Sequence, residues 1–298
     1  MLSSKSLAAI LLALLLCRQA SAQVPTATGR TIAMSDAAWS LFIPDTIVHT
    51  GTTADILVHL HGDPATFRNN CKYANLNTII VTINYNGASS VYETPFSNQA
   101  LFGNILSEAL TKVRAQADFP DNLNWGKIGL SSFSAGYGGV RQILKNSTYY
   151  NEISCLLAAD SLYASFDAND KPLASQMVDY RKFALDAANG SKTFFFSHSQ
   201  VPTYTYSNTA ETADDLMAYV SVSPTAVNFD GLGTLHFYRK AVKGKFTVEG
   251  ATGSDGDSHL EHLRYSGEFL SALPLAKVPE PSLLAPVTMV LVFLRRSR

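Results

Sequence analysis

The sequence predicts an α/β protein with a doubly wound, mostly parallel sheet, and two observations carry this prediction. Short apolar runs rich in β-branched residues alternate along the chain with segments whose apolar side chains recur every three or four residues, which is the spacing of an amphipathic helix. Strands that alternate with helices form parallel sheets with helices on both faces. With 298 residues, 46% of them hydrophobic, the chain is long enough to bury a large core in one domain.

The expected elements follow one another in order. Residues 77–84 are the clearest strand, because this β-branched run is continuous, as in a strand covered on both faces. Residues 98–116 are the clearest helix. Further strands are expected at 39–44 (an edge strand ended by Pro44), 55–60, 127–132, 152–159, 192–197, 235–239 and 245–249, and further helices at 140–144, 172–189, 209–219 and 259–272, the last with Ser258 as N-cap. Residues 23–35 are expected to form an exposed arm, and 199–233 a lid or insertion.

Residues 1–22 have the layout of a secretory signal peptide. Lys5 precedes the apolar run 7–16, and the small residues 20–22 stand before Gln23. A basic start, an apolar stretch of this length and an A-x-A site are the parts of a cleaved signal. We therefore expect an exported protein whose catalytic domain spans 23–277.

The last residues combine three features in a fixed order. A Pro279-Glu280-Pro281 motif comes first, an uncharged run follows over 283–294, and the chain ends in basic residues at 295–298. The segment 278–298 resembles the PEP-CTERM sorting tail of certain Gram-negative bacteria. The resemblance implies processing by sorting machinery at the envelope, and a protein that is attached to the cell surface or released outside the cell. The apolar run is short for a membrane span, which normally needs about 20 residues.

Charge and cysteine content exclude several classes of protein. Charged residues make up 16% of the chain, the formal net charge is -1, and no basic run occurs in the interior, which argues against a nucleic-acid partner. We expect contact with a membrane only through the terminal signals. Two cysteines remain after signal removal, Cys71 and Cys155. Cys155 lies in an apolar run and is expected to be a buried free thiol, although export permits a disulfide between the two.

The segment Ser132-Phe133-Ser134-Ala135-Gly136 carries the first chemical signal. An apolar strand ends in small residues and passes into helix-compatible sequence, so that Ser134 stands at a sharp turn from strand to helix. This pattern resembles the G-x-S-x-G nucleophile turn of α/β-hydrolases, with serine in place of the first glycine. The resemblance covers residues 38–272 by the order of motifs, and it implies an α/β-hydrolase architecture with Ser134 as nucleophile.

A serine nucleophile needs a base and an orienting acid, and α/β-hydrolases carry them in the order serine, acid, histidine. Asp160 is the first acid after Ser134 at the end of a strand. This is one strand earlier than in most members of the family, but the later strand leads into a segment without a carboxylate. His259 is the expected base because it stands at a helix start after the last strand. His262, one helical turn further on, is the alternative base or a residue that shapes the pocket.

The oxyanion of the tetrahedral intermediate needs backbone N–H donors. Ala135, which follows the nucleophile, supplies the first. The sequence His61-Gly62-Asp63-Pro64 resembles the His-Gly motif that lipases and esterases place after an early strand, and by that match the N–H of Asp63 is the second donor.

A metal site is the competing interpretation of the histidines. His59 and His61 are separated by one residue, and His259 and His262 by two, with Asp255 and Asp257 nearby. Alternate residues of a strand point to opposite faces, so His59 and His61 are expected to diverge. Since no H-E-x-x-H spacing occurs, we expect neither a catalytic metal nor another cofactor.

The tyrosines could line a pocket for a sugar or aryl group, or belong to core and surface. The sequence does not sort them; the candidates are Tyr73, Tyr85, Tyr92, Tyr137, Tyr163, Tyr204 and Tyr206.

Together these features predict an exported serine hydrolase that cleaves a small-molecule, carbohydrate or lipid ester. Ser134, Asp160 and His259 are the expected catalytic residues, with the N–H groups of Asp63 and Ala135 as the oxyanion hole. Two alternatives remain open. Acyl transfer would place a sugar or lipid hydroxyl where the hydrolase uses water, and a surface-anchored binding module would use the same scaffold without catalysis.

Overall fold

The computed structural model describes residues 23–49 and 51–279. The predicted signal peptide at 1–22 and residues 280–298 of the predicted sorting tail lie outside this range. Within it, every helix is too short or too polar to cross a membrane.

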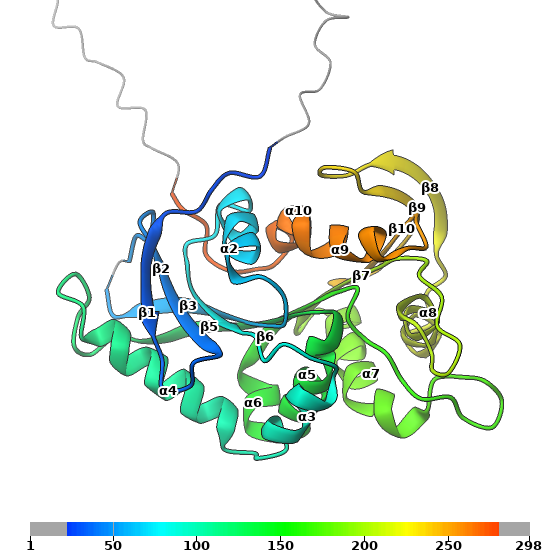
Figure 1. The fold of residues 1–298 in the computed structure, drawn as a ribbon, viewed down its shortest axis with the longest axis horizontal. Helices are drawn as coiled ribbons and strands as arrows, with labels where there is room; N and C mark the ends of the chain where they lie inside the picture. Colours follow the sequence, from blue (N-terminus) through cyan, green and yellow to red (C-terminus); the bar gives the residue numbers. More distant parts are fainter. Residues whose placement is uncertain (1–22, 50, 280–298) are drawn as a thin grey trace, which may run out of the picture.

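One twisted sheet organises the described chain, and it confirms the predicted fold class (Figure 1). The strand order is β1-β2-β4-β3-β5-β6-β7-β10-β9-β8. The inner strands from β4 to β10 run parallel, whereas β1, β2, β9 and β8 add antiparallel pairs at the two edges. The strands are β1 Gly29–Ala33, β2 Trp39–Pro44, β3 Thr53–Leu60, β4 Thr78–Ile83, β5 Asn124–Phe133, β6 Ile153–Ala159, β7 Thr193–His198, β8 Thr225–Asp230, β9 His236–Lys243 and β10 Phe246–Ala251.

Helices cover both faces of the sheet, which explains why the inner strands are apolar throughout. Figure 1 shows α2, α9 and α10 on one face, and α4, α5 and α7 on the other. Each face has its own core, with Phe67, Leu263 and Phe269 under the first group and Ile105, Val140 and Phe183 under the second. The helices are α2 Pro64–Tyr73, α3 Ser90–Phe96, α4 Leu101–Arg114, α5 Tyr137–Lys145, α6 Ser147–Glu152, α7 Ala174–Ala188, α8 Thr209–Tyr219, α9 Gly256–Arg264 and α10 Gly267–Ser271.

The structure differs from the sequence-based assignment at both edges of the sheet. Part of the expected arm at 23–35 forms β1, which pairs with β2, so the segment 39–44 is not an edge strand. β8 was not predicted, and its side chains are mostly exposed. The helices α2, α3 and α6 were also missed.

The last helical segment starts earlier than expected and is divided in two. Asp255 is the N-cap of α9, because its carboxylate accepts hydrogen bonds from the N–H and hydroxyl of Ser258. The expected N-cap, Ser258, therefore lies inside the first turn, where its hydroxyl is a donor to the true cap. A break at Tyr265 and Ser266 separates α9 from α10.

Both cysteines of the described chain are buried free thiols. Burial raises the pKa of Cys155 to about 12, and it raises the pKa of Cys71 as well. The predicted free thiol at Cys155 is thus what the structure contains, and neither thiol ionises readily near neutral pH.

Phe194 on β7 offers a direct test of the core. Its ring is fully buried and packs on the rings of Phe183, Phe196 and Phe246. We expect Phe194→Ala to lower the free energy of unfolding by about 3–5 kcal/mol, because the substitution removes buried apolar area and leaves a cavity. Urea denaturation at neutral pH measures the loss. Tyr204→Ala is the control, since that side chain is 88% exposed and its removal should change stability by less than about 0.5 kcal/mol.

Candidate active site

Ser134 stands where β5 turns into a helix. Its φ of +47° lies in the left-handed region, which is uncommon for a residue with a side chain and is frequent where a functional group is presented by a strained turn. A single 3₁₀ turn, Ser134–Gly136, connects it to α5. Gly136 permits the tight turn, because a Cβ at this position would come within 2.2 Å of the carbonyl oxygen of Leu60.

The serine that replaces the first glycine of the motif has a defined role. Ser132 is the penultimate residue of β5 and is fully buried. Its hydroxyl lies 2.8 Å from the Ser161 hydroxyl, and Ser161 donates to the backbone carbonyl of Ser134 at 2.8 Å. The departure from glycine therefore adds a hydrogen-bonded link beneath the turn, which the sequence pattern did not reveal.

Asp160 follows β6, the strand next to the nucleophile strand, and it is fully buried. One carboxylate oxygen accepts hydrogen bonds from the N–H of Ser199 at 2.9 Å and from the hydroxyl of Thr209. The other lies 2.6 Å from Nδ1 of His259. A buried carboxylate is stable only when its oxygens are satisfied, and here three elements supply the donors.

The environment of Asp160 favours the carboxylate over the neutral acid. Burial alone would raise the pKa of this group, but the neighbouring His262 and His259 and the hydrogen bonds from His259 and Thr209 outweigh burial and hold the pKa well below its usual range. A carboxylate that stays ionised can stabilise a positive imidazolium beside it.

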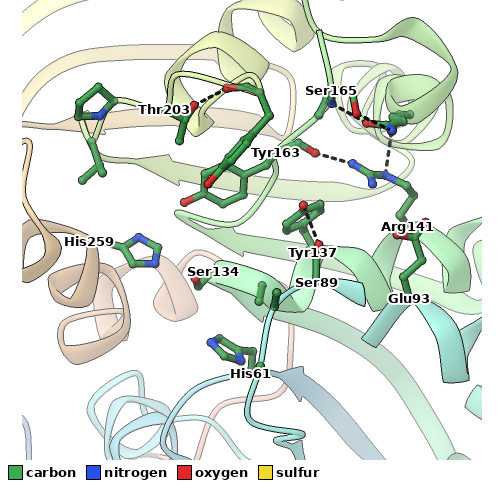
Figure 2. Close-up of a pocket in the computed structure, with 18 of the residues that line it drawn as sticks. His61, Ser89, Glu93, Ser134, Tyr137, Arg141, Tyr163, Ser165, Thr203 and His259 are labelled. Carbon is green, nitrogen blue, oxygen red and sulfur yellow. Dashed lines mark hydrogen bonds between the residues drawn. The ribbon is translucent and has the colours of Figure 1, made fainter. Parts of the chain in front are cut away.

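His259 lies on α9 and faces Ser134 across the pocket (Figure 2). Its ring stacks on Phe133 with a centroid distance of 4.6 Å, so its orientation is set by packing as well as by Asp160. Because Nδ1 is bonded to the carboxylate, Nε2 is the nitrogen available to a hydroxyl. Among the described residues the structure shows no hydrogen bond between Ser134 and His259, and such bonds are often long in the absence of substrate.

His262 lies one turn further along α9 but points elsewhere. It is fully buried, its Nδ1 lies 2.8 Å from the Ser197 hydroxyl, and it is not among the residues that line the pocket. Of the two histidines considered as base, the structure thus brings His259 to the pocket and buries His262 behind it.

The backbone N–H groups of Ala135, Gly62 and Asp63 are free to donate among the described residues. Ala135 lines the pocket, and its N–H has no hydrogen-bond partner in the described chain. His61 and Gly62 both have positive φ, at 72° and 104°. The N–H of His61 is bonded to the Ile83 carbonyl at 2.8 Å, whereas those of Gly62 and Asp63 have no partner among the described residues. Asp63 is the N-cap of α2 and does not itself line the pocket.

A pocket of about 740 Å³ opens over Ser134 and His259. Three tyrosines of the set that the sequence could not sort, Tyr137, Tyr163 and Tyr206, lie together on its wall. The lining also contains His61, Gly87, Ala88, Ser89, Glu93, Ala135, Arg141, Ala164, Ser165, Gln176, Val201, Pro202, Thr203 and Gly256.

The segment 199–233, expected as a lid or insertion, divides into parts with different positions. Residues 201–206 contribute to the pocket wall. In contrast, α8 packs on α7 and β7, and β8 extends the sheet through β9. Only the loop before α8 therefore lies at the mouth of the site.

The histidines considered as metal ligands are dispersed. His59 is buried, stacks on Phe67 at 3.6 Å and lies 3.0 Å from the Ser131 hydroxyl, whereas His61 lines the pocket. Within residues 23–49 and 51–279 no group of three or more His, Cys, Asp or Glu side chains is arranged to hold a metal ion.

Several residues of this site were not predicted from the sequence. Thr209 and Ser199 hold Asp160, and Arg141 and Glu93 line the pocket. Arg141 follows Tyr137 by four residues on α5, about one helical turn, and this spacing was the available signal for Arg141. The contacts of Thr209 depend on the packing of α8 and had no local signal.

The strand order and the serine turn after β5 define the α/β-hydrolase fold. No protein-family model matches the chain, and no curated protein is significantly similar to it in sequence. Solved structures that resemble it include the feruloyl esterase module of Clostridium thermocellum (TM-score 0.45, 11% identity, 83% of this chain and 88% of that chain) and an arylesterase (TM-score 0.41, 12% identity, 91% and 93%). A dienelactone hydrolase-like promiscuous phosphotriesterase from metagenomic libraries gives a TM-score of 0.43 at 11% identity, with 83% and 99% covered.

Three buried histidines should make stability depend on pH. Burial lowers the pKa of His59 and His198 to about 3 and that of His262 to about 4, whereas an unfolded histidine titrates near 6.5. Below pH 6.5 the unfolded chain therefore binds protons that the native state does not. Stability is complete above that pH and is lost as the pH falls towards 4, by up to about 1.4 kcal/mol per pH unit for each histidine.

Urea denaturation between pH 7.5 and about 4.5 measures this dependence. His59→Asn should flatten the curve, because it removes one of the three groups. A wild-type stability that is constant over this range would contradict the prediction.

Proposed function

We propose that the protein is an exported serine hydrolase that cleaves carboxylic esters. The observation that supports this best is the 2.6 Å contact between the buried Asp160 and His259. His259 lines the same pocket as Ser134, which is held in a strained turn. Asp160 is buried and ionised, His259 is oriented by it, and Ser134 is presented at the opening. These are the parts that nucleophilic catalysis by serine requires.

In the proposed mechanism Ser134 Oγ attacks the acyl carbon while Nε2 of His259 accepts the hydroxyl proton. The Asp160 carboxylate stabilises the imidazolium that forms. The oxyanion accepts hydrogen bonds from the N–H groups of Ala135 and Asp63. When the tetrahedral intermediate collapses, His259 returns the proton to the leaving alkoxide and an acyl-enzyme remains. Water, deprotonated by His259, then attacks the acyl carbon and releases the acid.

Export is proposed from the ends of the chain. The resemblance of residues 1–22 to a signal peptide and of residues 278–298 to a PEP-CTERM tail supports a location at the envelope or outside a Gram-negative-type cell. An ester substrate met in that location comes from the surroundings of the cell or from its surface.

A fluorophosphonate probe tests the nucleophile. We expect one covalent adduct, located on Ser134 by mass spectrometry of the folded protein, because Ser134 lines the same pocket as His259, the proposed base. Ser134→Ala should abolish labelling. Ser165→Ala, which removes another hydroxyl from the pocket wall, should be labelled as the wild type is. A folded wild-type protein that forms no adduct would overturn the proposal and favour a binding module.

The two histidines of α9 are separated by kinetics. His259→Ala should lower kcat on a p-nitrophenyl ester by about 10³ to 10⁴-fold, because the general base is lost. His262→Ala should reduce it much less, since this ring contacts Ser197 behind the site. Comparable residual activity in the two variants would count against His259 as the base.

A further inference from the structure

One face of the nucleophile helix forms part of the pocket wall. Tyr137 and Arg141 lie on α5, four residues apart, and both line the pocket together with Ser134. Residues four apart lie on one side of a helix. Ser134 precedes α5 by one 3₁₀ turn, so with a rise of about 1.5–2 Å per residue its backbone is on the order of 10 Å from that of Arg141. The wall therefore runs from the nucleophile over a tyrosine to a guanidinium.

Arg141 is a buried cation without a carboxylate partner. It is 6% exposed, its Nε donates to the Gln176 carbonyl at 3.1 Å, and a terminal nitrogen donates to the Tyr163 carbonyl. No carboxylate of the described chain lies within 4 Å of it, whereas Arg181 and Arg239 each pair with an aspartate. Burying a charge is costly unless an opposite charge accompanies it. A negatively charged group of a ligand in the pocket would therefore stabilise Arg141.

Among the described residues, Glu93 is the one carboxylate that lines the pocket. Its Oε1 accepts a hydrogen bond from Nε2 of Gln142 at 2.8 Å, and it forms no ion pair with Arg141. The negative charge of Glu93 weakens the attraction of an anion to the pocket, but it leaves the Arg141 guanidinium without a carboxylate partner.

The position of His259 decides which part of an ester reaches Arg141. The leaving alcohol must lie on the His259 side, because that imidazole returns the proton to the leaving oxygen. Figure 2 shows His259 and Arg141 on opposite sides of Ser134. The acyl part therefore extends away from His259, along Tyr137 and towards Arg141.

We propose that the enzyme prefers esters whose acyl chain ends in a carboxylate, and that Arg141 binds this carboxylate. The proposal rests on the proposed hydrolase function. Nε and one terminal nitrogen of Arg141 already donate to backbone carbonyls, and the other terminal nitrogen, Nη1, has no partner among the described residues and can donate to a carboxylate. Tyr137, over whose ring the guanidinium lies at 4.9 Å, gives the intervening chain an apolar surface. The substrate class is thus the monoesters of dicarboxylic acids.

Matched substrates test this preference. Mono-p-nitrophenyl esters of adipate, pimelate, suberate and azelate are compared with the same compounds whose free carboxyl is capped as a methyl ester. We expect kcat/KM to be higher for the free acid by on the order of tenfold or more at the best chain length, as for a charge-assisted hydrogen bond. Added salt should reduce the ratio.

Variants locate the group responsible. Arg141→Gln should bring the ratio of acid to capped ester close to one, Arg141→Lys should keep part of it, and Glu93→Gln should raise it by removing a like charge from the wall. Arg181→Gln, on α7 and outside the pocket lining, should leave the ratio unchanged. The wild-type ratio and the Glu93→Gln variant test the proposal even if Arg141 variants do not fold.

The two proposals fail in different ways. Capped esters hydrolysed as fast as the free acids by the wild type would overturn the role of Arg141 and leave the hydrolase function standing. Absence of turnover of every ester, together with no fluorophosphonate adduct on Ser134, would overturn the hydrolase function and this inference with it.

Discussion

The satisfied burial of the Asp160 carboxylate is the constraint on which the site depends. An ionised group with no exposure needs donors from the protein, and they come from the segment after β7, from the start of α8 and from α9. Each contact fixes one of these segments relative to the sheet. The same carboxylate that orients the imidazole therefore also positions α8, and with it the loop 201–206 that borders the pocket.

The pocket has two ends that differ in composition. At the end that holds Ser134 and His259, Phe133 packs against both His259 and His61, so the residue before Ser134 separates two imidazoles. At the other end the wall is polar and aromatic, with Tyr137 and Arg141 on α5. Because Ser134 and Arg141 are both carried by the turn after β5 and the helix that follows it, the distance between the two ends is set by a rigid element rather than by loops.

The sheet and the residues at its carboxyl edge were predictable from sequence, because a strand end or a helix start can be read locally. Ser134 and Asp160 directly follow strands, and His259 lies in the first turns of α9, so parallel pairing brings them to one edge. The true N-cap of α9 was not predictable, since Asp255 and Ser258 are both good caps. Nor was the role of Thr209, whose contact with Asp160 joins residues 49 positions apart and depends on tertiary packing.

Asp160 and His259 are 99 residues apart in the sequence. This separation affects when the site can form. The turn at Ser134 is made of neighbouring residues, whereas the imidazole arrives with the last helices of the domain. Closing so long a loop costs conformational entropy, so the contact between Asp160 and His259 depends on the whole segment between them. A chain that has not reached residue 259 lacks this imidazole, and the arrangement is therefore complete only when the last helices of the domain are present.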